Sequence, residues 1–446
     1  MKSRLKKIIP PGALNRYHQV MAIAANWLYG RPSEKMIVIG VTGTNGKSST
    51  VWLIAKILEA AGYKVGATST AMFKIADREW LNDQKMTMLG RLALQKILKQ
   101  MLKAGCQYAV VETSSEGIKQ HRHWGINYDV AIFTNLTPEH LEAHGSFDQY
   151  KQAKLKLFAK IGRSRKKQLD GRKITKTIIV NGDDQYSQEF LAFPADQKIS
   201  FGLGNSILDL RAEEIKFTSD GVSFELAGNR FVAPLLGRFN IYNSLAAISA
   251  ARSQGIDWAV CQRALKATEG IPGRLEFIEE GQNFQVMVDY APEPESLRQL
   301  YQTISDHQLV GPNQKIIQVL GSCGGGRDKS RRPVLGRLAG DRADYVIVTN
   351  EDPYDDDPVE IIDAVADGAL AVGKTLDKNL FKIWERREAI IKALNLAGAG
   401  DLVLLTGKGC EQAICVAGGK KIPWDERQVV REEIRSRLAQ KNQINK

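Results

Sequence analysis

The sequence contains few cysteines and no long hydrophobic run. The cysteines show no C-x-x-C spacing, which argues against a thiolate metal centre and is typical of a reducing compartment. They are Cys106, Cys261, Cys323, Cys410 and Cys415. Neither a cleavable leader nor a stretch of about 20 apolar residues is found, which argues against a membrane span. We therefore expect a globular cytoplasmic protein.

Charge of one sign is in excess, with 62 lysines and arginines against 50 aspartates and glutamates and a net charge of +12. The basic residues are spread along the chain without a zinc-finger or RNA-binding signature, so we expect no nucleic-acid partner. Lys2, Arg4, Lys6 and Lys7 precede an apolar helix expected over residues 17–29. That helix is too short to span a bilayer. It either packs on the next domain or makes a peripheral contact with the inner face of an anionic membrane.

A glycine-rich turn follows the first expected strand, residues 37–42, and leads into a helix. Glycines let successive backbone N–H groups converge on an anion, Lys47 can reach the β- and γ-phosphates, and the Ser48 hydroxyl can bind Mg²⁺. Val41 stands where the strict G-x-x-x-x-G-K-[ST] pattern has its first glycine. The predicted nucleotide-binding residues here are Gly43, Thr44, Asn45, Gly46, Lys47, Ser48 and Ser49. The segment predicts a site for ATP and Mg²⁺.

The length of 446 residues and the hydrophobic content of 43% predict two or three domains with separate cores. Short apolar strands alternate with helical stretches, which is typical of βαβ units on a parallel sheet. Residues 199–234 read as antiparallel strands, and the charged tail after Gln428 reads as a solvated helix. We expect an α/β fold: an N-terminal helical segment (1–35), a P-loop central domain with a mostly parallel sheet (36–270), and a smaller Rossmann-like C-terminal domain (271–446).

Two further strand ends carry polar groups that should face the phosphate loop. Glu112 ends one expected strand, and Asn135 ends the next and leads into the loop containing His140. A carboxylate near an ATP γ-phosphate holds Mg²⁺, and an imidazole among oxygen ligands can hold a second divalent ion.

These segments resemble the Mur ligases, ATP-dependent amide-forming enzymes of peptidoglycan precursor synthesis, and most resemble the type that makes the muramoyl tripeptide. The resemblance rests on residues 43–48, 112–115, 120–122, 133–145 and 150–154. It implies that Glu112 and His140 bind metal, together with Ser48. Lys154 stands where the family carries a carbamylated lysine whose added carboxylate positions Mg²⁺. The residues implied to contact the muramoyl-peptide substrate include Ser114, Gln120 and Arg122.

The resemblance continues into the second half of the chain. It implies adenine contacts from Asn240 and Asn243, a hinge arginine at Arg274, and the start of the C-terminal domain at Asp289. The loop with Asp328, Lys329 and Arg332 is implied to lie near nucleotide or acyl phosphate. Further substrate contacts implied by position are Thr87, Asp352, Lys408 and Glu411.

The implied reaction adds an amino acid, such as lysine or diaminopimelate, to UDP-N-acetylmuramoyl-L-Ala-D-Glu through an acyl phosphate. Lys47, Lys154, Arg274 and His140 are the implied catalytic residues, and no enzyme nucleophile is needed. We expect a monomer. The alternatives are a related ligase acting on a lipid-linked muropeptide or a folate-type substrate, and a nucleotide-binding protein without catalysis.

The chain also departs from the family pattern. The first expected strand begins at residue 37, and the segment before it is too short for the family's uridine-binding domain. We therefore expect that uridine recognition is reduced, that a partner supplies it, or that the acceptor is presented differently, as a lipid-linked instead of a UDP-linked precursor. The diaminopimelate-type motif Asp-Asn-Pro-Arg is replaced by residues 351–354, Glu-Asp-Pro-Tyr, and tyrosine cannot replace a bidentate guanidinium. The acidic residues of this loop suit an ammonium, which favours lysine or another diamine over diaminopimelate. Glu116, Pro292 and Cys410 stand where histidines are usual, and Met86 and Met88 flank Thr87 in place of Thr and Pro.

Overall fold

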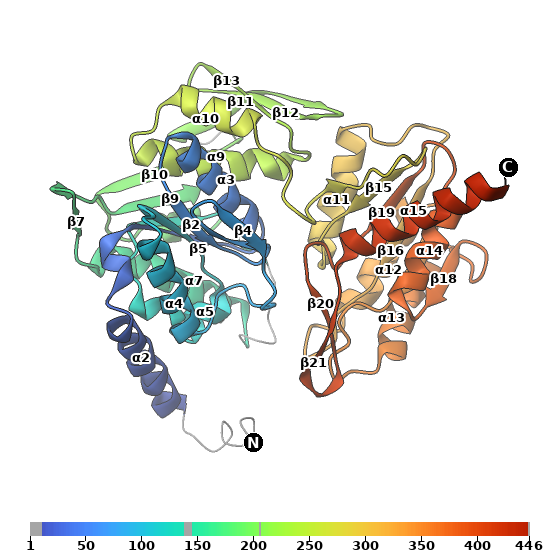
Figure 1. Cartoon of the computed structure of the whole chain (residues 1–446), viewed down its shortest axis with the longest axis horizontal. Coiled ribbons are helices and arrows are strands. Elements are labelled where there is room, and N and C mark those ends of the chain that lie inside the picture. The colour runs from blue at the N-terminus through green and yellow to red at the C-terminus, as the bar shows by residue number, and fades with distance from the viewer. Residues whose placement is uncertain (1–10, 138–144, 205–206, 445–446) are drawn as a thin grey trace.

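The computed structural model describes residues 11–137, 145–204 and 207–444. It forms two α/β lobes, each built on its own sheet (Figure 1). The larger lobe contains an 11-stranded sheet and the smaller one a 6-stranded sheet. The expected α/β class, with a mostly parallel central sheet and a smaller second sheet, is confirmed.

The larger sheet is parallel in its middle and antiparallel at its edges. Its strand order is β13-β12-β11-β10-β9-β6-β1-β5-β2-β3-β4. The parallel strands are β1 (Ile37–Thr42), β2 (Val65–Thr68), β5 (Tyr108–Glu112), β6 (Val130–Phe133), β9 (Thr177–Asn181) and β10 (Gln197–Gly202). The edge strands are β3 (Met72–Ile75), β4 (Arg78–Leu81), β11 (Leu210–Thr218), β12 (Gly221–Leu226) and β13 (Asn229–Ala233). Because β1, β5 and β6 are neighbours, the loops that follow them meet at one edge of the sheet.

The expectation of antiparallel strands over 199–234 is wrong for its first part. Strand β10 runs parallel to β9 and pairs in parallel with the start of β11, whereas β11, β12 and β13 are antiparallel. The physical reason is that helix α8 (Ser187–Leu191) connects β9 to β10 as a crossover, which makes these two strands parallel. Tight turns join β11 to β12 and β12 to β13, which makes those pairs antiparallel.

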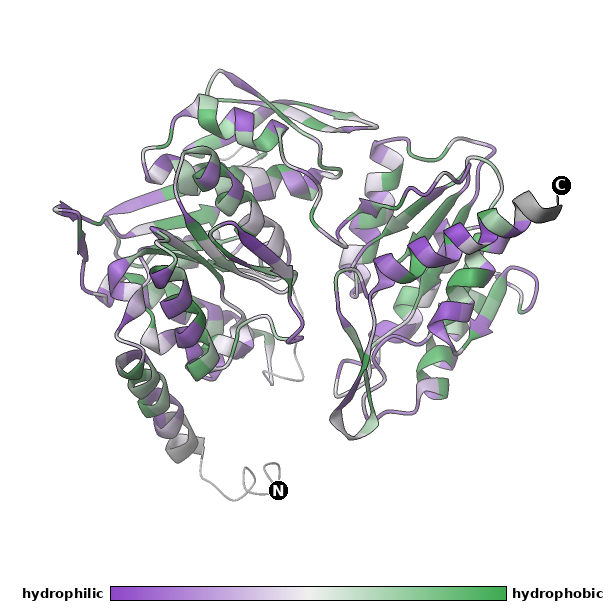
Figure 2. Cartoon of the chain, viewed as in Figure 1, coloured by the Kyte–Doolittle hydropathy of each residue, from purple (hydrophilic) through white to green (hydrophobic). Residues whose placement is uncertain are grey.

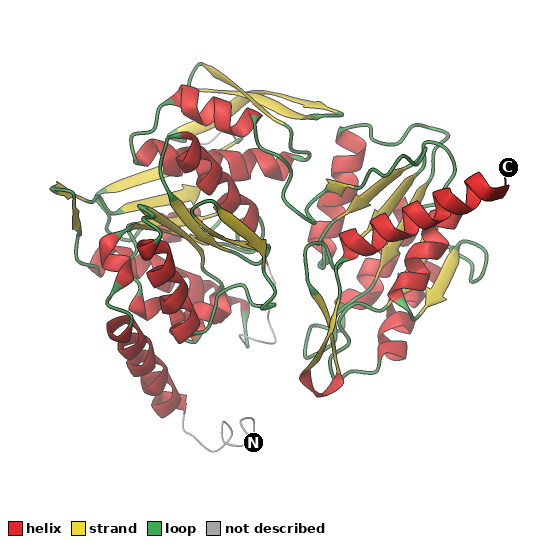
Figure 3. Cartoon of the chain, viewed as in Figure 1, coloured by secondary structure: helices red, strands yellow, loops and turns green. Residues whose placement is uncertain are grey.

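Helices cover both faces of the larger sheet (Figure 3). One hydrophobic core lies between the sheet and α3 (Lys47–Ala60), α9 (Arg238–Ser253) and α10 (Trp258–Lys266). The other lies under α4 (Arg91–Lys103), α5 (Ser115–Lys119), α7 (Phe147–Arg163) and α8. A small hairpin, β7 (Gln168–Leu169) with β8 (Arg172–Lys173), follows α7. Buried strands with both faces covered read as apolar runs, and Figure 2 shows this hydrophobic colour on the inner strands of both lobes.

The smaller sheet has the order β14-β15-β19-β16-β17-β18. Its strands are β14 (Glu276–Phe277), β15 (Gln285–Val288), β16 (Ile316–Leu320), β17 (Tyr345–Thr349), β18 (Leu380–Ile383) and β19 (Leu402–Leu405). On one face lie α11 (Pro294–Asp306), α12 (Arg331–Arg342) and α13 (Pro358–Leu370), and on the other lie α14 (Arg386–Leu396) and α15 (Glu426–Ile444). A hairpin of β20 (Ala413–Val416) and β21 (Lys420–Pro423) precedes α15.

Helix α15 corrects the expectation of a solvated tail. Its residues Val429, Val430 and Ile434 are buried in the core beneath α14. Charged residues such as Glu432 and Arg435 lie exposed on the outer face, so composition alone concealed this apolar stripe.

The N-terminal helix α2 (Pro11–Leu28) packs by one face on the central lobe, beside α4 and the 3-10 helix η2 (Arg122–Gly125). The turn η1 (Pro32–Lys35) then leads into β1. In the part of the chain that the structure describes, no helix is long and apolar enough to cross a membrane.

Candidate active site

The phosphate loop joins β1 to α3 at the centre of the larger sheet. Gly46 adopts φ 80°, and a Cβ built on it would lie 2.3 Å from Asn243 Oδ1, so both the backbone conformation and the close approach of α9 require glycine. The Lys47 ammonium donates to the Thr44 carbonyl at 2.7 Å. The Asn45 backbone N–H donates to Asn135 Oδ1 at 2.8 Å, which ties the loop to the end of β6. The loop thus forms with the geometry that an anion cradle needs.

Oxygen atoms gather beside this loop. The Ser48 hydroxyl donates to Glu112 Oε2 at 2.7 Å, and the Thr70 hydroxyl bridges Glu112 Oε1 (3.0 Å) and Thr87 Oγ1 (2.9 Å). Glu112 is 1% exposed. The structure therefore brings together the predicted metal ligands Ser48 and Glu112 and the predicted substrate residue Thr87. This donor set consists of hydroxyl and carboxylate oxygens, which suit a hard cation such as Mg²⁺.

The second predicted metal site is described only in part. His140 lies outside the described residues. Within residues 11–137, 145–204 and 207–444, no group of three or more His, Cys, Asp or Glu side chains is placed to hold a metal ion. Lys154, on α7, is buried, and its ammonium donates to the Gly43 carbonyl at 2.7 Å. It also lies 4.3 Å from the centre of the Tyr150 ring. Lys154 thus contacts the phosphate loop directly.

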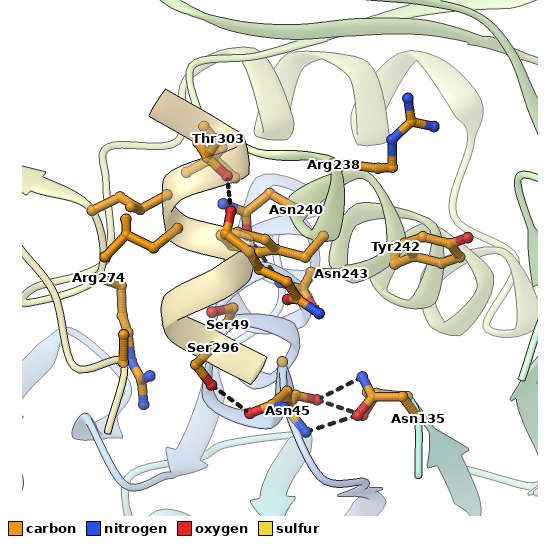
Figure 4. A pocket seen from close by; sticks show the side chains of 18 of the residues that line it. Asn45, Ser49, Asn135, Arg238, Asn240, Tyr242, Asn243, Arg274, Ser296 and Thr303 are labelled. Carbon is orange, nitrogen blue, oxygen red and sulfur yellow. Dashed lines mark hydrogen bonds between the residues drawn. The ribbon is translucent and has the colours of Figure 1, made fainter. Parts of the chain in front are cut away.

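A cavity of about 340 Å³ opens between the two lobes next to the phosphate loop (Figure 4). Central-lobe residues Asn45, Ser49, Asn240 and Asn243 line it, as do Arg274 and Asp289. Helix α11 closes one side, where the Ser296 hydroxyl lies 3.4 Å from Asn45 Oδ1. Burial raises the pKa of Asp289, although the neighbouring Arg274 opposes this shift. The cavity is large enough for a nucleoside, and it joins the predicted adenine and hinge residues to the phosphate loop.

Gly273 and Arg274 lie where the chain passes between the lobes. A Cβ on Gly273, whose φ is 64°, would lie 2.1 Å from the Cys410 backbone nitrogen. The Arg274 guanidinium stacks 4.4 Å from the centre of the Tyr290 ring. The sequence analysis missed α11, because no motif marks Ser296 or Thr303 and they reach the site only through the packing of the two lobes.

A second cavity, of about 170 Å³, lies over the Lys47 end of the loop. Lys47, Ser48, Thr87 and Glu112 line one side of it. The opposite side is formed by C-terminal residues, among them Arg274, Glu293, Cys323, Arg327 and Arg331. Arg331 is ion-paired with Glu293. Among the described residues, the buried Nε atoms of Arg274 and Arg331 find no hydrogen-bond partner. The side chains of Arg274 and Arg331 line this cavity together with the phosphate loop, and their positive charge suits a bound anion.

The loop before α12 carries the predicted residues Asp328, Lys329 and Arg332. Asp328 and Lys329 are exposed and line neither of these cavities. Arg332 is buried and pairs with Asp356 at 2.9 Å. Arg327 and Arg331 take the cavity-facing positions instead.

The predicted muramoyl-peptide residues lie together around α5. Ser114 caps this helix, accepting from the Gly117 N–H at 3.2 Å. The Arg122 guanidinium donates to Gln120 Oε1 at 2.7 Å and to the Met88 carbonyl. Neither cavity is lined by Ser114, Gln120 or Arg122. They follow β5, so they belong to the same edge of the sheet as Glu112.

The predicted amino-acid residues form a buried ionic cluster between the lobes. The Lys408 ammonium contacts Asp352 at 2.9 Å and Glu411 at 2.8 Å. Lys85, from the loop after β4, contacts Asp352 at 2.6 Å and Glu411 at 3.0 Å. Burial opposes ionisation of Asp352, but Lys408 and Lys85 outweigh it and hold the pKa of this carboxyl below its usual value. Lys85 was not predicted, since it meets Asp352 only across the lobe boundary.

Residues 41–251 match the Mur ligase middle domain, and residues 273–409 match the Mur ligase, glutamate ligase domain. The UDP-N-acetylmuramyl-tripeptide synthetase of Roseiflexus sp. (strain RS-1) is 37% identical over 430 residues, covering 94% of this chain and 82% of that protein. The UDP-N-acetylmuramoyl-L-alanyl-D-glutamate–2,6-diaminopimelate ligase of Geobacillus kaustophilus (strain HTA426) is 37% identical over 434 residues, covering 96% and 85%.

Solved structures agree with this relationship. A UDP-N-acetylmuramoyl-L-alanyl-D-glutamate–2,6-diaminopimelate ligase superposes with a TM-score of 0.62 at 28% identity, covering 94% of this chain and 83% of that one. The folylpolyglutamate synthase of Mycobacterium tuberculosis with ADP has a TM-score of 0.67 at 17% identity, covering 87% and 91%, which shows a shared fold alone. Given the two matching domains and the relatives at 37% identity over most of their length, this chain belongs to the Mur ligase family, the ATP-dependent ligases that form carbon–nitrogen bonds.

Proposed function

We propose that this chain joins the carboxylate of a UDP-muramoyl-L-Ala-D-Glu acceptor to the amine of an amino acid, using ATP. The observation that carries the proposal is the cavity in which the phosphate loop and Glu112 face Arg274, Arg327 and Arg331. Cations from two lobes converge there on the place where a γ-phosphate would lie. A protein that only bound nucleotide would have no need of this second set of cations.

The reaction requires no covalent bond to the protein. An acceptor carboxylate oxygen attacks the γ-phosphorus of ATP, and ADP leaves. The amine nitrogen then attacks the acyl carbon, inorganic phosphate leaves, and the nitrogen gives up a proton. Lys47 and the arginines offset the negative charge that spreads over the transferring phosphoryl group, and closure of the lobes excludes water.

Ser48 and Glu112 would hold the Mg²⁺ that this chemistry needs. A cation bound to their oxygens would neutralise charge on the phosphates. Because Glu112 also accepts from the Thr70 backbone N–H at 2.7 Å, its carboxylate is already oriented toward Ser48.

The origin of an oxygen atom in the product tests this route. Acceptor labelled with heavy oxygen in its reacting carboxylate should pass one labelled atom to the released phosphate, measured by mass spectrometry. Labelled phosphate supports an acyl phosphate. Unlabelled phosphate, with amide still formed, would contradict the mechanism.

Lys154 is proposed to act as a carbamate. Lys154 is buried against the Gly43 carbonyl, so a carboxylate added to it would lie beside the phosphate loop and would attract Mg²⁺ instead of repelling it. We predict that removing dissolved carbon dioxide lowers turnover by about tenfold or more and that bicarbonate restores it, because one metal-orienting ligand is lost. The measurement is phosphate release in degassed and bicarbonate-supplemented buffer.

The matched control is Lys154→Glu, which supplies a permanent carboxylate. This variant should not respond to bicarbonate, whatever its basal rate. Equal rates of the unsubstituted protein with and without carbon dioxide would show that Lys154 acts as an ammonium.

For the amino acid we propose lysine or a related diamine. Tyr354 replaces the arginine of the diaminopimelate-type motif, and Asp352 and Glu411 offer two carboxylates to an ammonium. In the structure, the Lys85 ammonium occupies the position between these two carboxylates. The backbone of Lys85 has a φ of 50°, in the left-handed region that is unfavourable for a residue with a side chain. The incoming ammonium would displace the Lys85 ammonium.

Replacing Lys85 with alanine should therefore lower the KM for the preferred diamine by about tenfold, because an internal competitor for the same carboxylates is removed. The measurement is steady-state phosphate release against amine concentration. Lys421→Ala is the control: Lys421 also bridges the lobes, donating to the Gln84 carbonyl at 3.1 Å, without touching Asp352. A rise in KM for Lys85→Ala would show that Lys85 supports substrate binding instead.

A further inference from the structure

Helix α2 presents a row of large apolar side chains to solvent. Tyr17, Val20, Ile23, Trp27 and Leu28 are between 43% and 70% exposed. Their spacing places them on one side of the helix. A soluble chain seldom gathers so many large apolar groups on a single exposed helical face, and such faces mark interaction sites.

The opposite face fixes α2 in place. Ala22 and Ala25 are buried, and a Cβ built on Gly125 of η2 would lie 2.7 Å from the Ala22 carbonyl oxygen. The helix therefore packs closely against the central lobe, and its apolar row faces outward as a consequence. Figure 1 shows α2 at the margin of the molecule, extending beyond the body of that lobe.

The charge near α2 is mainly positive. Residues 1–33 contain six lysines and arginines and no aspartate or glutamate, which is half of the net charge of +12. Just beyond α2, Arg31, Lys35, Arg165 and Lys173 line a shallow depression in which Glu34 is the acidic member. Basic residues thus precede the apolar row in the sequence, and further basic side chains line the depression just beyond the end of α2.

We propose that α2 and the adjoining basic residues bind the surface of an anionic membrane. An apolar helical face rimmed by cations matches lipid in both respects, since the side chains enter the boundary of the acyl region while the cations meet lipid phosphates. A second copy of this chain fits less well, because two such helices would bring like charges together. The helix lies in the membrane plane and does not cross it.

Vesicle co-sedimentation of the full chain, without ATP or acceptor, tests the proposal independently of the proposed ligase function. The chain should bind vesicles containing phosphatidylglycerol, bind phosphatidylcholine vesicles about tenfold more weakly, and dissociate as salt rises. The triple variant V20S/I23S/W27S should lose at least about tenfold in affinity for the anionic vesicles, since three apolar side chains no longer enter the lipid.

The matched control is W384S/I422S, which removes two exposed apolar residues of the C-terminal lobe that are 45% and 51% exposed. This variant should bind vesicles unchanged. Equal binding to neutral vesicles, or an α2 variant that binds as well as the original chain, would overturn the proposal. Sedimentation velocity without vesicles tests the alternative that this face binds a second copy of the chain. If the original chain formed a dimer that V20S/I23S/W27S abolished, the proposed membrane contact would be overturned.

Discussion

Replacing Lys47 with alanine is expected to lower amine-dependent phosphate release from ATP by about 10³-fold. The side chain begins α3 at the mouth of the second cavity, where its ammonium donates to the Thr44 carbonyl at 2.7 Å. A cation at this point stabilises charge on the transferring phosphoryl group more than it stabilises bound ATP. We therefore expect the loss mainly in kcat, with a smaller effect on ATP affinity.

The control for this experiment is Lys56, another lysine of helix α3. Lys56→Ala removes an ammonium that pairs with Glu79 at 3.0 Å and lies 4.1 Å from the centre of the Trp52 ring, outside both cavities. Its rate should stay within about twofold of the original, because a surface ion pair contributes little. A Lys47→Ala protein that retains more than about a tenth of the original kcat would contradict the role given to this residue.

Replacing Glu426 with alanine is expected to destabilise the C-terminal lobe by about 3–5 kcal/mol, because it leaves a buried guanidinium without its counter-charge. Arg386 and Glu426 are both fully buried, and the guanidinium donates to Glu426 Oε2 at 2.8 Å. It also donates to the carbonyls of Asn350 and Thr406, at the ends of β17 and β19. Equilibrium unfolding in urea, followed by tryptophan fluorescence, measures the change.

The same two helices supply a matched control. Arg387 of α14 pairs with Glu432 of α15 at 2.7 Å on the exposed surface. Glu432→Ala should leave the free energy of unfolding nearly unchanged, because an exposed ion pair contributes little. If Glu426→Ala and Glu432→Ala lowered stability equally, the buried pair would not be the contact that holds α15 to this lobe.

Local chemistry explains what could be read from the sequence. The phosphate loop was identifiable because an apolar strand, glycines and Lys-Ser occur in one short run, and the positive φ of Gly46 shows why a glycine is needed there. Asn240 and Asn243 were identifiable as a pair because they lie one helical turn apart, and they are hydrogen-bonded at 2.9 Å.

What the sequence could not show depends on how the lobes meet. Lys85 and Asp352 are 267 positions apart, and only the packing of the lobes places one beside the other. The same holds for Ser296 beside Asn45, and for Arg327 and Arg331, which line the second cavity opposite the phosphate loop. Neither a hydrophobic periodicity nor a short motif encodes contacts between the two lobes. Site residues that the C-terminal lobe contributes are therefore the most easily missed.

The most direct test of the account is phosphate release from ATP and Mg²⁺ with UDP-muramoyl-L-Ala-D-Glu, scanning lysine, ornithine and diaminopimelate. The account predicts release that requires both the acceptor and an amine, with lysine preferred over diaminopimelate. Release that proceeds equally without acceptor or without amine, or no release with any amine, would contradict it.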